Sequence, residues 1–502
     1  MGVMLVTSQT RGFIDAHRHE NVRDLALKAR REDGLDLPFA LDQIAGWQTA
    51  RAKLPQWAAS DGIIYPPHLS MEQCSSQFTA QYKARVARRI VDAYLASDAP
   101  AAWGATAASD ARNTPDTSDA PAADGGTALA DLTGGFGVDF SYLAREFDRA
   151  TYVERQPHLC AIAEHNLRAL GLTHARVVNA DAETWLADGG SATMIVVDPA
   201  RRDDHGGRTV AIADCTPDVL ALADRLLAAA PLVMVKLSPM LDWRKTVADF
   251  RGAVGEVHIV STGNECKELL VVLDRRRLAS ATADQPANGS AVVWRAGSAA
   301  DGMAAAGARA AAVGERLPVR VVCINDGDEL AYDYDPSAPS ADRMVGTMST
   351  GLLSDGWYDV RETADDADAG DDGGLEARYL YEPNASIMKA GCFALIEERY
   401  PMRQVGPNSH LFVSMQRVDR FPGRAFAVEA VGGLGKKDVR SLLAGATKAN
   451  VTVRNFPMSV VQLRRKLKLG DGGDVYLFAT TLAGSRHVLI RARRLPSARS
   501  DG

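Results

Sequence analysis

The chain has 502 residues, which is too long for one ordinary core and predicts about three domains. Hydrophobic residues make up 46% and charged residues 24%, as in globular proteins, and no apolar run reaches the roughly 18 residues that span a bilayer. The six cysteines are scattered without a CxxC pair, which argues against a metal site and a disulfide framework. Because the N-terminus lacks a signal-peptide pattern, we expect a cytoplasmic protein with reduced cysteines and no membrane partner.

The net charge of −6 is unevenly distributed along the chain. From Arg378 to Gly502 there are 21 Lys and Arg against 9 Asp and Glu, a net charge of +12, so residues 1–377 carry −18. Basic surfaces attract phosphate groups, and a basic module on an acidic body indicates contact with nucleic acid. A solvated basic surface without a partner is the alternative.

Residues 1–103 are expected to form an N-terminal helical domain, because residues 39–47 and 72–95 place apolar side chains at helical spacing. Residues 104–126 are rich in Ala, Ser, Thr, Asp, Pro and Gly and have no apolar periodicity. This composition is typical of a flexible linker.

Residues 127–275 alternate short apolar strands with helices. The expected strands are 128–132, 150–154, 176–179, 194–197 and 232–236, and the expected helices are 138–147, 157–170 and 218–229. This alternation predicts an α/β fold whose parallel sheet is covered on both faces. Residues 256–261 and 268–273 follow with little between them and are expected to close the sheet as an antiparallel pair.

Residues 276–377 are expected to form a connecting region with flexible loops, because they include an Ala-rich stretch and an acidic run with glycines. Residues 378–495 return to a regular order of strand, helix, strand, helix, strand and strand. This order resembles a split βαβ, ferredoxin-like α+β arrangement. This last domain lies in the segment whose net charge is positive.

A glycine-rich turn follows the first strand of the α/β domain, in the segment Asp131-Leu-Thr-Gly-Gly-Phe-Gly137. Glycines let a backbone approach a ligand and adopt positive φ, and the following helix N-terminus favours an anionic group. The cofactor-binding residues expected in this turn are Asp131, Thr133, Gly134, Gly135 and Gly137. The dinucleotide fingerprint GxGxxG is incomplete here, because Phe140 occupies its third glycine position.

Two further acids follow the next two strands. Glu154, about 20 residues after the turn, lies where an acid accepts hydrogen bonds from ribose hydroxyls. Asp181 follows the third strand, where a carboxylate can accept from an adenine amino group. Each acid alone fits a helix cap or a surface charge. Together with Asp131 and the glycine turn, they define one crevice at the carboxyl ends of the strands.

Seven short segments carry a resemblance to a known family. They are Leu69-Ser-Met-Glu-Gln-Cys-Ser-Ser76, Asp131-Leu-Thr-Gly-Gly-Phe-Gly-Val-Asp139, Asp198-Pro-Ala-Arg-Arg202, Val235-Lys-Leu-Ser-Pro239, Asn264-Glu-Cys-Lys-Glu-Leu269, Tyr381-Glu-Pro-Asn384 and Phe421-Pro-Gly-Arg424. Residues 127–273 resemble class I methyltransferases that depend on S-adenosylmethionine. Nearly the whole chain is similar to bacterial methyltransferases that end in a THUMP-like domain.

The resemblance implies a class I, Rossmann-like methyltransferase sheet, with S-adenosylmethionine as the cofactor. It further implies that Asp131 and Gly135 meet the methionine end of the cofactor, Glu154 its ribose and Asp181 its adenine. The C-terminal domain over residues 378–495 is then the THUMP-like one.

Asp198-Pro-Ala-Arg-Arg202 follows the fourth strand, beside the crevice. In amino-group methyltransferases this place holds [Asp/Asn]-Pro-Pro-[Tyr/Phe], which orients the target amino group and stacks on the base. Ala200 and Arg201 depart from that pattern, and the segment is closer to the Asp-Pro-Pro-Arg of some RNA methyltransferases. We therefore expect Asp198, Pro199 and Arg201 to be catalytic, with Arg201 stacking on a base or holding a phosphate. A loop cap is the alternative role of Asp198.

Seven basic side chains are expected to contact RNA. They are Arg202, Arg208 and Lys236 in the α/β domain, and Arg464, Arg465, Lys466 and Lys468 on a predicted C-terminal helix. An ordinary solvated surface is the alternative for each group. Carbon-5 methylation of a pyrimidine needs a thiolate, and Cys215 and Cys266 lie in the domain. A buried, inert cysteine is the favoured interpretation of both.

The sequence thus favours methyl transfer to structured RNA, rRNA or tRNA, which the C-terminal domain presents. Two alternatives remain open. One is methylation of a protein or small molecule, which leaves the basic domain unexplained. The other is a non-catalytic RNA-binding protein with a relic fold, against which the intact Asp131, Glu154, Asp181 and Asp198 argue.

Overall fold

The computed structural model describes residues 7–28, 34–66, 71–72, 74–97, 126–201, 212–278, 317–338, 344–345, 378–482 and 486–496. The chain divides into two compact units, which are residues 1–257 with 269–317 (unit 1) and residues 258–268 with 318–502 (unit 2). Strands β8 (Val254–Thr262) and β9 (Glu265–Asp274) contribute residues to both units. The predicted linker, apart from residue 126, lies outside the described residues.

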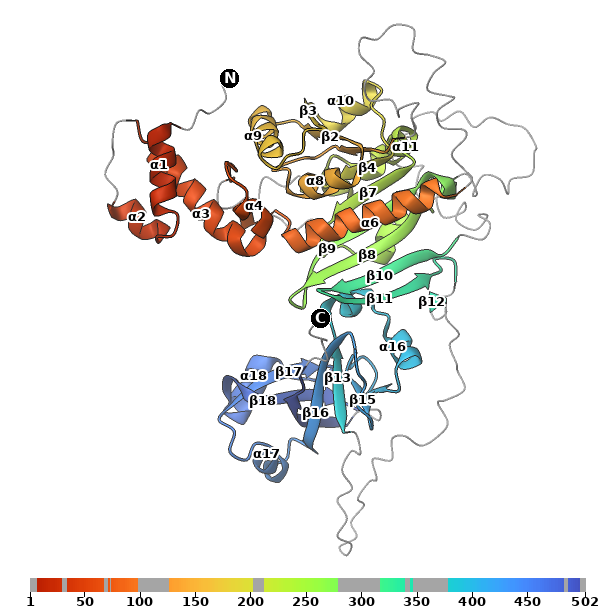
Figure 1. Cartoon of the computed structure of the whole chain (residues 1–502). Coiled ribbons are helices and arrows are strands. Elements are labelled where there is room, and N and C mark those ends of the chain that lie inside the picture. The colour runs from red at the N-terminus through yellow and green to blue at the C-terminus, as the bar shows by residue number, and fades with distance from the viewer. Residues whose placement is uncertain are drawn as a thin grey trace, which may run out of the picture. The chain divides into compact units, whose positions relative to one another are not determined.

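Unit 1 begins with helices, as the sequence predicts (Figure 1). They are α1 (Ser8–His17), α2 (Val22–Lys28), α3 (Leu37–Lys53), α4 (Pro55–Ala59) and α6 (Gln77–Leu95). The hydroxyl of Ser76 caps α6 by accepting from the amide of Thr79 (3.2 Å). Helix α6 packs along α8 (Val138–Leu143) of the α/β part, and Trp57 Nε1 donates to Ser141 Oγ (3.1 Å). The helical segment therefore shares a core with the α/β part instead of standing apart from it.

The sheet of unit 1 has the strand order β3-β2-β1-β4-β7-β9-β8. Its other strands are β1 (Ala128–Asp131), β2 (Arg149–Glu154), β3 (Ala175–Asn179), β4 (Met194–Val197) and β7 (Leu232–Leu237). These five strands are parallel, and β9 lies antiparallel to β7, with Lys236 opposite Leu270. Residues 194–197 are all buried, as expected for a strand covered on both faces. The structure confirms the predicted parallel sheet and its antiparallel closure.

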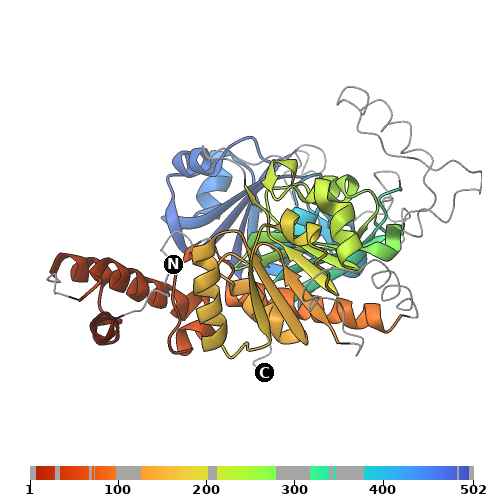
Figure 2. The ribbon, with the colours of Figure 1, turned by 90° about the horizontal axis from the view of Figure 1, so that it is seen from above.

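Helices cover this sheet on both faces. They are α8, α9 (Pro157–Ala169), α10 (Ala182–Ala187), α11 (Val219–Ala229) and α12 (Trp243–Asp249), with the short 3₁₀ helices η2 (Ala144–Glu146) and η3 (Ile212–Asp214) and the two-residue strands β5 (Ala200–Arg201) and β6 (Cys215–Thr216). Figure 2 shows α9 and α11 on opposite sides of the sheet. The turns after β1, β2, β4 and β7 consequently meet at the carboxyl edge of the sheet, where α/β proteins bind ligands.

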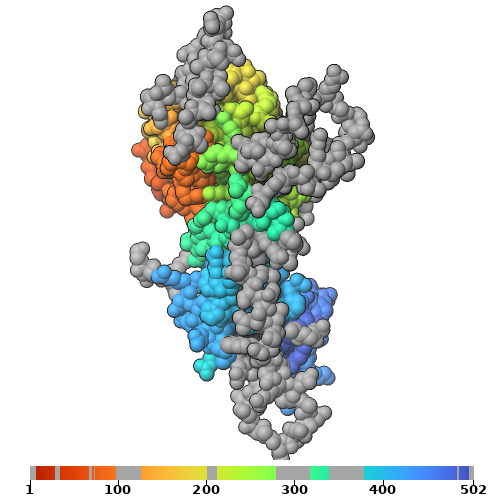
Figure 3. Space-filling view, turned by 90° about the vertical axis from the view of Figure 1, so that its right-hand side faces the viewer, coloured from red at the N-terminus to blue at the C-terminus, as the bar shows by residue number. Residues whose placement is uncertain are grey.

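Unit 2 contains a seven-stranded sheet in the order β14-β15-β13-β16-β19-β18-β17, whose residues are coloured from cyan to blue in Figure 3. Its strands are β13 (Tyr379–Pro383), β14 (Arg403–Gln404), β15 (Phe412–Ser414), β16 (Gly423–Gly432), β17 (Lys448–Arg454), β18 (Gly470–Thr481) and β19 (His487–Arg494), and its helices are α15 (Ala385–Ala390), α16 (Phe393–Arg399), α17 (Lys436–Leu442) and α18 (Val460–Leu467). Alternate residues enter two cores: Phe478 and Ile490 pack with Phe426 in one, and Leu477 and Leu489 in the other.

The C-terminal elements occur in the predicted order, and β19 and β18 lie between β16 and β17, the two parallel strands that α17 connects, as in a split βαβ unit. Strand β17 pairs in parallel with β18, so no strand lies between the two strands that α18 connects. Sequence order alone does not fix which strands become neighbours, and here only the unit built on α17 is split.

The region 276–377, expected to be loop-rich, contains an antiparallel hairpin. Strands β10 (Val319–Asn325) and β11 (Asp328–Tyr334) pair along their whole length, and β12 (Met344–Val345) pairs antiparallel with the end of β11. In β11 every second residue is buried (Leu330, Tyr332 and Tyr334), a period-2 pattern that the sequence interpretation missed.

Among the described residues, no helix combines the length and the apolar character that crossing a membrane requires. Within the same ranges, no group of three or more His, Cys, Asp or Glu is arranged to hold a metal ion.

Candidate active site

The turn after β1 is shaped by its glycines. A Cβ atom on Gly134 would lie 2.1 Å from Cε2 of Tyr152, which is far inside van der Waals contact. Gly135 and Gly137 have φ of +54° and +74°, in the left-handed region that favours glycine. Gly137 is also the N-cap of α8. At these three positions the turn therefore has no side chains that cover its backbone, at the carboxyl edge of the sheet.

Two buried acids flank this turn. Asp131 Oδ1 accepts from the amide of Thr133 (3.0 Å), and Glu154 Oε2 accepts from the amide of Gly135 (3.0 Å). Burial raises the pKa of Asp131 to about 7; the hydrogen bond from Thr133 opposes this rise, and the carboxylates of Asp139 and Asp198 add to it. Asp131 is therefore an acid whose charge is poorly compensated within the protein, and a cation beside it would favour the ionised form.

Asp181 lies at the N-terminus of α10, where its Oδ1 accepts from the amide of Thr184 (2.7 Å). The hydrogen bonds from Thr184 lower the pKa of this exposed carboxyl group. The structure thus gives Asp181 a capping role. Its role toward adenine stays a prediction.

Asp198 follows β4 and lies beside the glycine turn. Its amide donates to Thr133 Oγ1 (2.6 Å), and its Oδ2 accepts from Lys236 Nζ at the end of β7 (2.5 Å). The Asp198 side chain is 46% exposed, whereas that of Lys236 is 17% exposed. The structure therefore brings together the predicted catalytic acid, the predicted turn and one of the predicted basic residues.

A chain of charges continues from this pair into the interior. Lys236 Nζ lies 3.7 Å from Asp139 Oδ2, and Asp139 Oδ1 lies 3.2 Å from Nζ of Lys83, whose side chain is 1% exposed. Ser75 Oγ donates to Asp139 Oδ2 (2.8 Å) and accepts from Lys83 Nζ (3.1 Å). Burial would raise the pKa of Asp139, but the two ammonium groups and Ser75 hold it below its usual value.

The sequence interpretation gave no role to Lys83, Asp139 or Ser75. Ser75 and Asp139 lie in segments that carry the family resemblance, which was the available signal. Lys83 had none, because a lysine on an amphipathic helix is ordinarily solvated.

Among the residues that the structure describes, the remaining predicted site residues form no hydrogen bond or ion pair with the glycine turn or with Asp198. Pro199 is half-buried in the loop after Asp198, Arg201 belongs to β5, and Arg202 and Arg208 lie outside the described residues. On α18, Arg464 pairs with Asp471, whereas Arg465 and Lys466, together with the C-cap residue Lys468, are exposed. The RNA contacts of all these side chains stay predictions.

The cysteine thiols do not resemble activated nucleophiles. Cys215 is buried, and burial raises the pKa of the Cys266 thiol. A raised pKa lowers the thiolate fraction of Cys266, and this disfavours the carbon-5 mechanism at that residue.

Comparison with known proteins identifies relatives of the C-terminal part of the chain and of the chain as a whole. Residues 423–494 match the family described as THUMP domain-like, and residues 379–422 match one described as a ferredoxin-like domain. A candidate methyltransferase of known structure from Porphyromonas gingivalis W83 is 26% identical, covers 97% of this chain and 98% of its own, and superposes with a TM-score of 0.66. The chain combines a class I methyltransferase fold with ferredoxin-like and THUMP-like C-terminal domains. The predicted fold class is thereby confirmed.

Relatives in Mycobacterium tuberculosis point to the same class. Uncharacterized S-adenosylmethionine-dependent methyltransferases of strains CDC 1551 / Oshkosh and H37Rv are each 32% identical over 143 residues, which are 26% of this chain. The match spans 38% of the length of these relatives, so it concerns only a part of each protein.

Proposed function

We propose that this protein transfers the methyl group of S-adenosylmethionine to structured RNA in the cytoplasm, and that its basic C-terminal domain binds the RNA. The observation that carries the proposal is the position of Asp198, whose amide is hydrogen-bonded to Thr133 of the glycine turn. This contact puts a partly exposed carboxylate, suited to orienting a target group, next to the turn proposed to hold the cofactor.

The residues of the turn fit S-adenosylmethionine, the cofactor for which the mycobacterial relatives are named. We assign Asp131 to the ammonium group of the methionine part, because among the described residues the hydrogen bonds of Thr133 are what stabilises the charge of this buried carboxylate. Glycines 134, 135 and 137 leave the backbone open to a ligand. Glu154 and Asp181 are assigned to the ribose and adenine. When bound, the cofactor supplies an electrophilic methyl group on a sulfonium.

The RNA assignment rests on charge and on domain type. Residues 378–502 carry a net charge of +12, and residues 423–494 are similar to THUMP domains. Arg465 and Lys466 on α18 and the C-cap residue Lys468 are exposed, so they can contact phosphates. Arg464 is assigned with them, although its pairing with Asp471 leaves it fewer free donors.

A methyl-transfer assay tests the proposed function. The purified protein and radiolabelled S-adenosylmethionine are incubated with total RNA from a strain that lacks the gene, with RNA from the parent strain as the control. We expect label to enter RNA from the deletion strain and much less to enter the already methylated parental RNA.

The alternative functions give different results in this assay. Label in protein or in small molecules from the same extract, with none in RNA, would favour the second enzyme class. Absence of S-adenosylmethionine binding in calorimetry would favour a relic fold that binds RNA without catalysis.

Cofactor binding should depend on pH through Asp131. Its pKa of about 7 is raised, so the free protein must release a proton before the carboxylate can meet a cation. Affinity for S-adenosylmethionine should therefore fall by about tenfold per pH unit below pH 7 and level off above it, as one linked proton requires. Calorimetry from pH 5.5 to 8.5 measures this slope.

The Asp131→Asn variant is the control, because it has no proton to release at this position. We expect its binding to be weak and nearly independent of pH over the same range. A flat profile in the unmodified protein would remove Asp131 from the cofactor site.

A further inference from the structure

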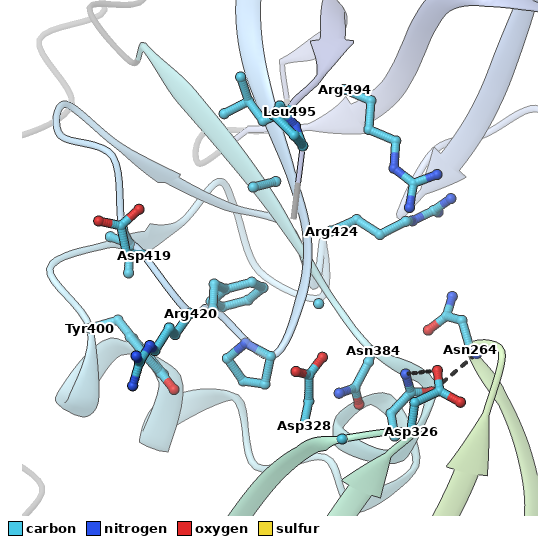
Figure 4. A pocket seen from close by; sticks show the side chains of 18 of the residues that line it. Asn264, Asp326, Asp328, Asn384, Tyr400, Asp419, Arg420, Arg424, Arg494 and Leu495 are labelled. Carbon is cyan, nitrogen blue, oxygen red and sulfur yellow. Dashed lines mark hydrogen bonds between the residues drawn. The ribbon is translucent and has the colours of Figure 1, made fainter. Parts of the chain in front are cut away.

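Unit 2 contains a pocket of about 1060 Å³, which belongs to no part of the proposed methyl-transfer site. Its lining comes from the turn at Asn264, the turn between β10 and β11, the N-terminus of α15, the segment 417–425 and the end of β19. Figure 4 shows Arg424 and Arg494 pointing toward one end of this pocket, with Asp326, Asp328 and Asn384 at the other. The volume suits an organic ligand of the size of a nucleotide.

Three of the segments that carry the family resemblance meet at this pocket. The amide of Asn384 donates to the carbonyl of Pro422 (3.1 Å), and the amide of Ala385 donates to Asn264 Oδ1 (2.9 Å). A Cβ atom on Gly423 would lie 2.2 Å from the carbonyl oxygen of Glu382, so the close approach of the paired strands β13 and β16 at this position requires glycine. Hydrogen bonds and close backbone packing thus hold the three segments together around the cavity.

Asn384 presents an unsatisfied donor to the pocket. The residue is 3% exposed, and its Oδ1 accepts from Ser386 Oγ (2.7 Å) and from the amide of Ile387 (3.2 Å). These bonds fix the orientation of the amide and turn Nδ2 away from the helix. Among the described residues Nδ2 has no hydrogen-bond partner. A buried donor without a partner costs about 1–3 kcal/mol, which a ligand acceptor would offset.

The opposite end of the pocket has excess positive charge. Arg424 Nε donates to Glu382 Oε2 (2.9 Å), and Arg454 Nη2 donates to Oε1 of the same buried carboxylate (2.9 Å). Arg494 lies on the same face of the sheet as Arg424, since β16 and β19 pair with Phe426 opposite Arg494. Within the described parts of the chain, the Arg494 side chain has no ion pair or hydrogen bond. The Glu382 carboxylate is paired with two guanidinium groups, and Arg494 adds a third cation on the same face as Arg424, which favours an anion.

We infer that this pocket binds a nucleotide, with its phosphate at Arg424 and Arg494 and its base and sugar toward Asn384 and the acidic end. Asn384 Nδ2 suits a carbonyl or ring-nitrogen acceptor. The carboxylate of Asp328 suits hydroxyl or amino donors, whereas both oxygens of Asp326 already accept hydrogen bonds from Thr262, Gly263 and Asn325. A nucleotide carries all three kinds of group. The nucleotide is either free or one unit of an RNA strand.

Equilibrium binding to the full-length protein tests this inference. The probes are the four nucleoside 5′-monophosphates, the corresponding nucleosides, inorganic phosphate and a short single-stranded RNA of mixed sequence. Arg494→Ala removes an arginine without a described partner. Asn384→Asp keeps the oxygen that caps α15 but loses the Nδ2 donor. Arg493→Ala is the matched control, because it changes the adjacent residue on the other face of β19, where the side chain is 63% exposed.

We expect the phosphorylated probes to bind more tightly than the nucleosides and inorganic phosphate. Arg494→Ala and Asn384→Asp should each weaken binding by about tenfold, the scale of one charge-assisted hydrogen bond, and Arg493→Ala by less than about twofold. Thermal unfolding of each variant checks that the fold is retained. Equal affinity for mononucleotides and RNA would identify a free nucleotide, and binding of RNA alone would identify a unit of a strand.

Two outcomes would overturn the inference. One is that neither the nucleotides nor the RNA bind, or that inorganic phosphate binds as tightly as they do. The other is that Arg494→Ala and Asn384→Asp, both folded, bind as the unmodified protein does. No methyl transfer is involved in these measurements, so their failure leaves the proposed function standing, and failure of the methyl-transfer assay leaves the nucleotide site standing.

Discussion

Replacing Asp198 by Ala should lower methyl-transfer turnover by about a hundredfold while changing S-adenosylmethionine affinity by no more than a few-fold. The scale is that of misplacing a reacting group by about an ångström. The two effects separate because the contact with the glycine turn is made by the Asp198 amide, which the substitution keeps. Only the carboxylate, which accepts from Lys236, is lost.

Turnover is measured with saturating RNA and cofactor, and affinity by calorimetry on the same preparation. Asp188→Ala serves as the control, because Asp188 is an exposed acid at the C-terminal end of α10 in the same unit. We expect it to leave both quantities unchanged. If Asp198→Ala turned over within a few-fold of the unmodified protein, the residue would be a structural cap and its catalytic assignment would be wrong.

Replacing Lys83 by Met should lower the free energy of unfolding by about 3–5 kcal/mol, the usual effect of removing one partner from a buried ion pair. The Lys83 side chain is 1% exposed and lies 3.2 Å from Asp139, which is 16% exposed. Without Lys83, the partners that Asp139 keeps among the described residues are Lys236, whose ammonium lies 3.7 Å away, and Ser75. Chemical denaturation of the two proteins gives the difference.

The same helix supplies a matched control. Arg88 and Asp92 form an ion pair on the surface of α6, with side chains that are 45% and 50% exposed. Arg88→Met should therefore cost about 1 kcal/mol or less. Adding Asp139→Asn to Lys83→Met should recover part of the lost stability, because it removes the uncompensated charge. A loss below about 1 kcal/mol for Lys83→Met alone would contradict a stabilising role of the buried pair.

The sequence by itself determined the parts of this protein that depend on neighbouring residues. The strand, glycine turn and helix around Asp131 lie in one continuous segment, so their pattern predicts a ligand-binding edge before any packing is known. Alternating strands and helices likewise predicted the parallel sheet, and the order of elements after residue 378 predicted an α+β domain. Local periodicity and turn chemistry carry this information because both act over a few residues.

The tertiary structure decided what distant residues do together. Lys83 on α6 and Lys236 on β7 flank Asp139 on α8, although 153 positions separate the two lysines in the sequence. Asn264, Asn384 and Arg424 meet around one cavity, and β17 pairs directly with β18. These arrangements follow from strand order and burial. Burial is a property of the packed chain, so a lysine such as Lys83, which in the sequence looks solvated, becomes an interior charge only once the sheet and its helices have formed.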